Sequence, residues 1–216
     1  MFVRDHMVSP AITVAPDLPF QEALKLMQEN RLRRLPVVDK KGKLIGIVSE
    51  RDLLYASPSP ATTLSMWELT YVLSKIVVDE LMTKEVVTTT PDTPIEDAAQ
   101  LMVEKKVGGL PVVDKDNKPV GIITDRDIFK ALVEMFGGGQ PGLRLTLEVP
   151  RGKGVLAAVS TSIFDQGGNI VSVGTFPIAN KSNVDGLVIK VEDVSQKQLI
   201  DTLEKLGDHV VDSREM

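Results

Sequence analysis

A short segment that combines a hydroxyl, a guanidinium and a carboxylate occurs twice in this chain of 216 residues. The two copies place these groups at Ser49, Arg51 and Asp52, and at Thr124, Arg126 and Asp127. A helix that begins at the hydroxyl residue offers free backbone N–H groups to a phosphate. The Arg side chain can bind phosphate oxygens, and the Asp can accept hydrogen bonds from both hydroxyls of a ribose. The segments therefore indicate nucleotide binding.

The same spacing has a second interpretation that needs no ligand. A Ser or Thr followed three residues later by an acidic side chain forms a capping box at the start of a helix. Capping does not explain why Arg51 of the first segment recurs as Arg126 in the second. The sequence leaves both interpretations open, and they are compatible.

The two segments belong to a longer internal repeat. Residues 7–56 align with residues 82–131 at a constant offset of 75 without a gap, and 21 of these 50 positions are identical. Each copy has the pattern of a short extended segment, a helix, two strands and a last helix, which is the order βαββα. One copy is small for an independent core, so we expect the copies to pack against each other.

The expected elements occupy matching positions in the two copies. Copy one has an extended segment at 11–14, a helix around 23–27, strands at 35–38 and 44–48, and a helix from Ser49. Copy two has the same elements at 86–89, around 98–102, at 110–113 and 120–123, and from Thr124. Between the copies, the apolar spacing from Leu64 to Ile76 predicts an additional amphipathic helix.

A different pattern follows a glycine-rich linker at 137–142. Alternating and helical spacing of apolar residues predicts strands at 143–149, 169–176, 186–192 and 209–213, and helices at 155–165 and 195–206. This βαββαβ order predicts an antiparallel sheet with both helices on one face. The chain as a whole is expected to belong to the α+β class.

The composition argues against several kinds of chemistry. The chain has no Cys and two His, so we expect no disulfide, no thiol catalysis and no metal site. A net charge of −5 is not typical of a nucleic-acid binder, and no apolar run is long enough to span a membrane. No general base or activated nucleophile stands out. We expect a cytoplasmic protein that is not an enzyme.

The paired motifs resemble those of cystathionine-β-synthase-type (CBS) domains, over residues 1 to about 135. The matching residues are Leu35–Asp39 and Gly46–Asp52 in one copy, and Leu110–Asp114 and Gly121–Asp127 in the other. The resemblance implies a homodimer and a pair of clefts for AMP, ADP, ATP or S-adenosylmethionine. It places Ile12, Thr13, Pro36, Val37, Ser49, Arg51 and Asp52 in one cleft. It places Val87, Thr88, Pro111, Val112, Thr124, Arg126 and Asp127 in the other.

Residues 142–216 are similar to an ACT domain, a ferredoxin-like βαββαβ unit. The matching residues are Gly154–Leu156 and Gly167–Ile170, while Arg151 and Lys153 stand where the family often has Asp and Pro. This resemblance implies pairing between ACT domains and amino-acid binding at the paired interface. The order CBS, CBS, ACT, with Leu64–Leu69 between the copies, resembles the bacterial acetoin-utilisation CBS–ACT proteins.

These patterns divide the chain into CBS domain 1 (1–60), an inserted helix (61–77), CBS domain 2 (78–136), the linker (137–142) and an ACT-like domain (143–216). We expect a regulatory sensor, in which an adenine nucleotide shifts the packing of the copies and the change reaches the ACT-like domain or a partner enzyme. The alternatives are a structural oligomerisation module with vestigial clefts, and an amino-acid sensor that acts through the ACT-like domain.

Overall fold

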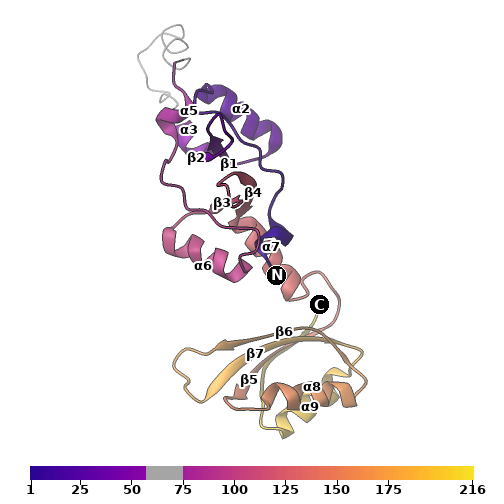
Figure 1. Cartoon of the computed structure of the whole chain (residues 1–216). Coiled ribbons are helices and arrows are strands. Elements are labelled where there is room, and N and C mark those ends of the chain that lie inside the picture. The colour runs from indigo at the N-terminus through magenta and orange to yellow at the C-terminus, as the bar shows by residue number, and fades with distance from the viewer. Residues whose placement is uncertain (57–74) are drawn as a thin grey trace. The chain divides into compact units, whose positions relative to one another are not determined.

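The computed structural model describes residues 1–56 and 75–216, which form two compact units, Met1–Phe129 and Lys130–Met216 (Figure 1). The first unit contains the repeat, and the second contains the βαββαβ segment. Most of the helix expected at 61–77 lies outside the described residues. Within the described ranges, no helix has the length and apolarity needed to cross a membrane.

Each copy of the repeat is built on an antiparallel hairpin. Copy one contains α1 (Val3–His6), α2 (Phe20–Asn30), β1 (Arg34–Val38), β2 (Leu44–Ser49) and α3 (Glu50–Tyr55). Copy two contains α5 (Val78–Leu81), α6 (Ile95–Lys105), β3 (Gly109–Val113), β4 (Pro119–Thr124) and α7 (Asp125–Met135). The strand register is the same in both, with Pro36 opposite Ile47 and Pro111 opposite Ile122. The predicted hairpins and helices are confirmed.

The first strand expected in each copy is reduced to a single parallel bridge. Val14 bridges Val37 in copy one, and Thr89 bridges Val112 in copy two. The Val14 N–H donates to the carbonyl of Pro36, and the Val38 N–H donates to the carbonyl of Val14. The next bonds in either direction would need N–H groups of Pro16 and Pro36, which proline lacks. The same obstacle occurs in copy two, at Pro91 and Pro111.

The start of each copy packs on the other copy, and we call these segments arm one (residues 1–9) and arm two (residues 76–84). Val8 of arm one pairs with Ile122 on β4, and Thr83 of arm two pairs with Ile47 on β2. Val78 of arm two is buried in the core of copy one, among Val14, Phe20, Ala23, Met27, Leu35, Val37, Val48 and Leu53. The copies therefore form one unit, which confirms the expectation that they pack together.

The second unit has the predicted βαββαβ order. Its elements are β5 (Leu143–Pro150), α8 (Val155–Asp165), β6 (Asn169–Pro177), β7 (Val184–Glu192), α9 (Gln196–Lys205) and β8 (His209–Glu215). The strands form one antiparallel sheet in the order β6-β7-β5-β8. Both α8 and α9 lie on the same side of this sheet (Figure 1). Their Val159, Ile163, Leu199 and Leu203 pack on alternate residues of β5 and β7.

The glycine-rich linker contacts the second unit through a buried lysine. The side chain of Lys190 on β7 points to the face without helices, yet this residue is only 2% exposed. Its Nζ donates hydrogen bonds to the carbonyl oxygens of Gly137 and Gln140. Phe136 lies over Gly174 of β6, where a Cβ would come within 2.7 Å of the ring. The segment 136–140 is therefore fixed to the sheet.

Candidate functional site

A cavity of about 310 Å³ lies between the two copies of the repeat. Copy one supplies the β1 and β2 ends and the start of α3, while copy two supplies arm two, the segment that follows it and the loop before β3. The lining residues are Arg34, Ile47, Ser49, Asp52, Thr83, Glu85, Val86, Val87, Lys106, Val107, Gly108 and Gly109. The cavity is thus built by both copies, whereas the sequence grouped the expected residues copy by copy.

Ser49 and Asp52 form the capping box that the spacing predicted. The Ser49 N–H and Oγ both donate to Asp52 Oδ2, at 2.9 and 2.6 Å, and the Asp52 N–H donates to Ser49 Oγ at 3.3 Å. These bonds satisfy one carboxylate oxygen, and Asp52 Oδ1 accepts no hydrogen bond from any described residue. Both residues line the cavity. Capping and ligand binding can therefore share one carboxylate.

Thr124 and Asp127 repeat this geometry at the start of α7. The Thr124 N–H and Oγ1 donate to Asp127 Oδ2 at 3.0 and 2.6 Å. Asp127 is 6% exposed, so its carboxylate is held deep beside the end of β4. The capping interpretation holds for both copies.

The arginines of the two segments do not lie with the carboxylates. Arg51 Nη2 donates a hydrogen bond of 3.0 Å to the Tyr55 hydroxyl, and its guanidinium stacks 5.2 Å from the centre of that ring. This hydrogen bond raises the pKa of the Arg51 guanidinium. Arg51 is not among the residues that line the cavity, and Arg126 is likewise exposed on α7. Side chains one position apart on a helix point about 100° apart, which explains the separation from Asp52 and Asp127.

The apolar residues expected around the base are distributed unevenly. Val87 lines the cavity, whereas Val37 and Val112 are fully buried in the strand cores and offer no surface to a ligand. Pro36 and Pro111 are also buried and accept bonds from the bridging segments. Ile12, Thr13 and Thr88 keep some exposure but do not line this cavity. Val37 is covered because it packs into the core of copy one.

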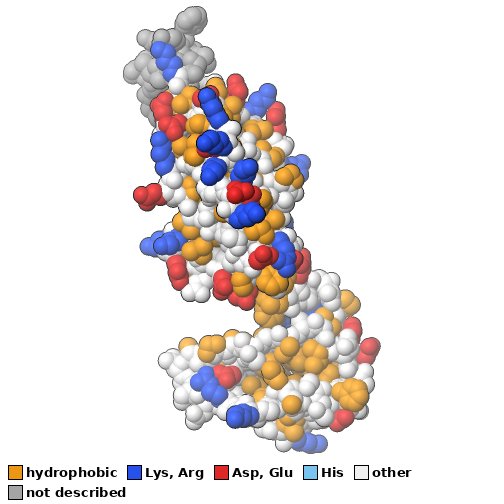
Figure 2. All heavy atoms as spheres, in the orientation of Figure 1, with side chains coloured by type: hydrophobic (Ala, Val, Ile, Leu, Met, Phe, Trp, Pro, Cys, Tyr) orange, Lys and Arg blue, Asp and Glu red, His pale blue; other side chains and the backbone are white. Residues whose placement is uncertain are grey.

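The cavity also contains residues that lie outside the paired motifs. Arg34, Glu85 and Lys106 contribute its charged groups, and Gly108 and Gly109 leave room for the Arg34 side chain. The signal was present in the repeat, because Arg33 and Arg34 of copy one align with Gly108 and Gly109 of copy two. Lys and Arg side chains also gather on the visible face of this unit (Figure 2).

Gly46 and Gly121 lie against the arms. A Cβ on Gly121 would meet the Val8 carbonyl oxygen at 2.9 Å and Met7 Sδ at 2.7 Å. At Gly46 the corresponding neighbour is the side chain of Met82. The glycines therefore permit the two copies to exchange their arms.

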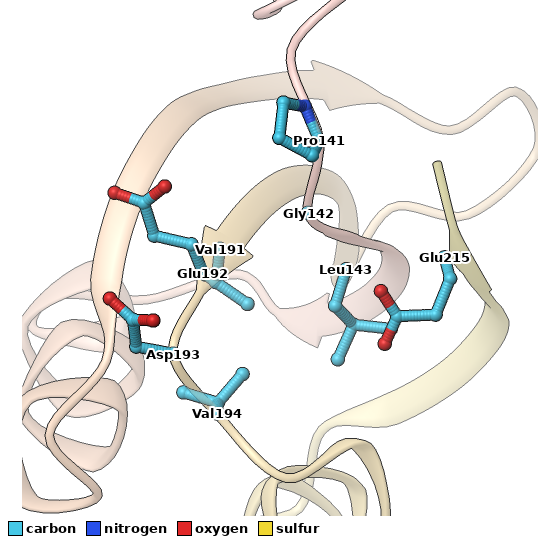
Figure 3. A pocket seen from close by; sticks show the side chains of 8 residues that line it. All are labelled: Pro141, Gly142, Leu143, Val191, Glu192, Asp193, Val194 and Glu215. Atoms are coloured by element: carbon cyan, nitrogen blue, oxygen red, sulfur yellow. The ribbon is translucent and has the colours of Figure 1, made fainter.

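A second cavity, of about 280 Å³, lies in the C-terminal unit (Figure 3). Three carboxylates surround it, from Glu192 at the end of β7, from Asp193 directly after it and from Glu215 on β8. Glu192 is engaged by Asn169 Nδ2 at 2.7 Å. Among the described residues, no cluster of His, Cys, Asp and Glu is arranged to hold a metal ion. An acidic rim of this kind repels phosphate.

The paired hairpins, exchanged arms and shared cavity define a tandem-repeat module with one candidate ligand site between its copies. The CBS domain family matches residues 3–59 and 78–134. The chain therefore belongs to the CBS-domain family. Both matched ranges lie within the repeat, and the relation of the C-terminal unit to ACT domains stays a prediction.

Known relatives carry the same pair in proteins of different size. A CBS domain-containing protein of Dictyostelium discoideum is 34% identical over 136 residues, which span 63% of this chain and 94% of that protein. Homoserine O-acetyltransferase of Methanohalobium evestigatum is 36% identical over 135 residues, 62% of this chain. The match covers only 24% of that enzyme, so it concerns the CBS pair and not the transferase.

Solved structures agree with the fold of the pair. CBSX2 in complex with AMP is 36% identical with a TM-score of 0.52, covering 62% of this chain and 97% of that chain. A CBS domain pair in complex with 5′-methylthioadenosine and S-adenosyl-L-methionine is 30% identical with a TM-score of 0.52, covering 61% and 95%. AcuB of Vibrio cholerae, assigned to acetoin utilization, is 33% identical with a TM-score of 0.51, covering 62% and 90%.

Proposed function

We propose that the CBS pair is a regulatory sensor that binds an adenine nucleotide or S-adenosylmethionine in the cavity between its copies. The observation that carries this proposal is the cavity of about 310 Å³, in which the Ser49–Asp52 cap faces an apolar wall. Its volume lies at the lower end of the range of small-molecule sites.

The lining offers a separate contact for each part of such a ligand. Asp52 Oδ1 is available to accept hydrogen bonds from ribose hydroxyls, since the cap uses the other carboxylate oxygen. Val86, Val87 and Val107 provide an apolar wall for the adenine ring. Arg34 and Lys106 supply the positive charge that a phosphate requires. AMP in CBSX2 and the adenosyl ligands of the other CBS pair support this class of ligand.

Regulation follows from where the cavity lies. A ligand that touches both copies favours arrangements in which the two walls stand at the right separation, so it shifts the packing of the pair. We further propose that this shift reaches a partner protein or the C-terminal unit, and that the pair works as a homodimer. AcuB-like architecture is consistent with a role in the regulation of acetoin metabolism.

Isothermal titration calorimetry of the full chain with AMP, ADP, ATP and S-adenosylmethionine tests the proposal. We expect saturable binding of at least one of the four. Absence of heat with all four, together with no thermal shift, excludes the sensor and favours a structural module whose cavity is vestigial.

The variant Asp52→Asn separates ligand binding from capping. Asparagine keeps one oxygen for the cap, but its amide nitrogen replaces the oxygen that would accept ribose hydrogen bonds. We expect affinity to fall by about 1 to 3 kcal/mol with little change in melting temperature. Lys25→Ala, which alters an exposed Lys25–Glu29 pair on α2, is the matched control and should bind as the parent does. Unchanged affinity in Asp52→Asn would assign the carboxylate to capping alone.

A further inference from the structure

The contacts between the two copies repeat at the offset found in the sequence. Val8 pairs with Ile122 and Ile47 with Thr83, and the four backbone hydrogen bonds are 2.9 or 3.0 Å long. Each bridge becomes the other when 75 is added to one partner and subtracted from the other. Each residue that lines the cavity therefore has an equivalent 75 positions away in the other copy. We call this second set of residues the equivalent surface. Its charged and hydroxyl groups belong to Arg31, Arg33, Arg34, Thr124 and Asp127.

The arginines of copy one therefore belong with the cap of copy two. The cavity is lined by Ser49 and Asp52 together with residues 106–109, so the exchange of copies groups Thr124 and Asp127 with residues 31–34 on the equivalent surface. The position of Arg34 agrees with this. A Cβ on Gly108 would lie 2.5 Å from Arg34 Nη2 and 3.2 Å from Oδ2 of Asp125, the residue after Thr124.

The cavity and the equivalent surface differ in charge. The cavity is lined by two cations, Arg34 and Lys106, and by two carboxylates, Asp52 and Glu85. On the equivalent surface, Arg31 replaces Lys106, Arg33 replaces Gly108, and Pro10 stands in place of Glu85. The cavity lining is therefore balanced, whereas the equivalent surface has Arg31 and Arg33 for one carboxylate, Asp127, and shares Arg34 with the cavity.

The two additional arginines are available for an anion. Arg31 and Arg33 are exposed, and neither has an ion pair or side-chain hydrogen bond with another described residue. By contrast, Arg4, Arg151 and Arg214 each bind an aspartate. The planar guanidinium groups of Arg31 and Arg33 can each bind two phosphate oxygens. Together they offer more hydrogen-bond donors than a single phosphate group uses.

We infer that the equivalent surface selects ligands with a di- or triphosphate chain, and that the cavity takes adenosyl ligands of low charge. The inference rests on the proposed function, because it assigns a charge class of ligand to the cavity and another to its equivalent surface. The CBS pair then binds two metabolites at the same time and recognises one of them by its phosphate chain.

The double variant Arg31→Gln with Arg33→Gln tests this assignment in the full chain. Calorimetric titrations with ATP, AMP and inorganic tripolyphosphate are compared with those of the parent protein, after melting curves establish folding. We expect the affinity for ATP and tripolyphosphate to fall at least about tenfold, and the affinity for AMP to stay within about twofold. The matched variant Lys106→Gln should show the reverse, with AMP weakened more than ATP.

Each outcome bears on one claim. Equal losses for ATP and AMP, or unchanged ATP affinity, overturn the charge assignment while leaving the proposed function in place. A parent protein that binds tripolyphosphate through Arg31 and Arg33 but no nucleotide contradicts the proposed function and keeps the anion site. If ATP and tripolyphosphate bind with equal affinity, the phosphate contacts are supported. The adenosine then contributes nothing to the affinity for ATP.

Discussion

The ammonium group of Lys190 donates a hydrogen bond of 3.0 Å to the carbonyl oxygen of Gly137. A second bond from the same group reaches the Gln140 carbonyl. The side chain is almost completely buried, so its charge is compensated by these two carbonyls of the glycine-rich segment. The glycine-rich segment is thereby tied to β7 of the same unit.

We predict that Lys190→Met releases this segment. Methionine fills similar space but leaves both carbonyl oxygens without their donor, which should lower the free energy of unfolding of the C-terminal unit by about 1 to 3 kcal/mol. Hydrogen exchange followed by mass spectrometry should show faster exchange in residues 136–142. Lys197→Met, on the exposed side of α9, is the control and should exchange as the parent does. Unchanged exchange would mean that the segment is held by Phe136 alone.

A second prediction concerns the capping boxes. Ser49→Ala and Thr124→Ala each remove the hydroxyl that bonds to the carboxylate at a helix start. Each should lower the free energy of unfolding by about 1 kcal/mol, which thermal denaturation can measure. Ser182→Ala in the exposed β6–β7 connection should have no effect. Equal melting temperatures for all three variants would exclude a stabilising role for the caps.

The sequence predicted most of the fold because the repeat has no gaps. Strand and helix positions follow from apolar spacing, and both helix caps follow from Ser49 and Thr124. It could not predict the exchange of arms, because an isolated bridge such as that of Val8 with Ile122 has no sequence pattern of its own. Nor could it show that prolines limit the first strand to one bridge.

The site was harder to predict than the fold. The cavity is lined by three of the residues expected in a cleft, Ser49, Asp52 and Val87. The sequence had assigned Val87 to a different cleft from Ser49 and Asp52. The lining of this cavity depends on the exchanged arms, so it combines residues that motif position had placed in two different clefts. Arg51 was chosen because it recurs, yet it contacts Tyr55 on the helix surface. The cavity does contain Arg34, a position at which the two copies differ.

The exchanged arms lead to a third prediction, which compares two equivalent glycines. Gly121→Ala would place a Cβ 2.9 Å from the backbone oxygen of Val8, which cannot move without breaking the bridge to Ile122. In Gly46→Ala the new methyl group meets the flexible end of Met82 instead. We expect Gly121→Ala to be less stable than Gly46→Ala by about 1 to 3 kcal/mol in denaturant unfolding.

The control for this comparison is Gly152→Ala, since a Cβ there has no neighbour within 4 Å. It should leave the denaturation midpoint of both units almost unchanged. If Gly46→Ala is as destabilising as Gly121→Ala, it makes no difference to the packing of the arms whether the new methyl group meets a backbone atom or a side chain.

A fourth prediction concerns the acid stability of the C-terminal unit. Arg151 donates to both oxygens of Asp185 on the neighbouring strand β7, with distances of 2.6 to 3.1 Å. These hydrogen bonds hold the pKa of Asp185 below its ordinary value. A carboxyl whose pKa is lower in the folded state stabilises the fold above the unfolded pKa, and this stability disappears as the pH falls through the folded pKa.

Arg151→Gln should therefore raise the pKa of Asp185 and move the acid unfolding of this unit to higher pH. The carboxyl titration can be followed by NMR, and unfolding by the amide signals of β5 and β7. Because the pair is partly exposed, its contribution should decrease in about 1 M salt, where charges are screened within about 3 Å. Arg144→Gln tests the same sheet with a weaker partner, since Arg144 lies 3.7 Å from Asp212, which already binds Arg214. Identical acid midpoints for the parent and Arg151→Gln would show that the pair adds no pH-dependent stability.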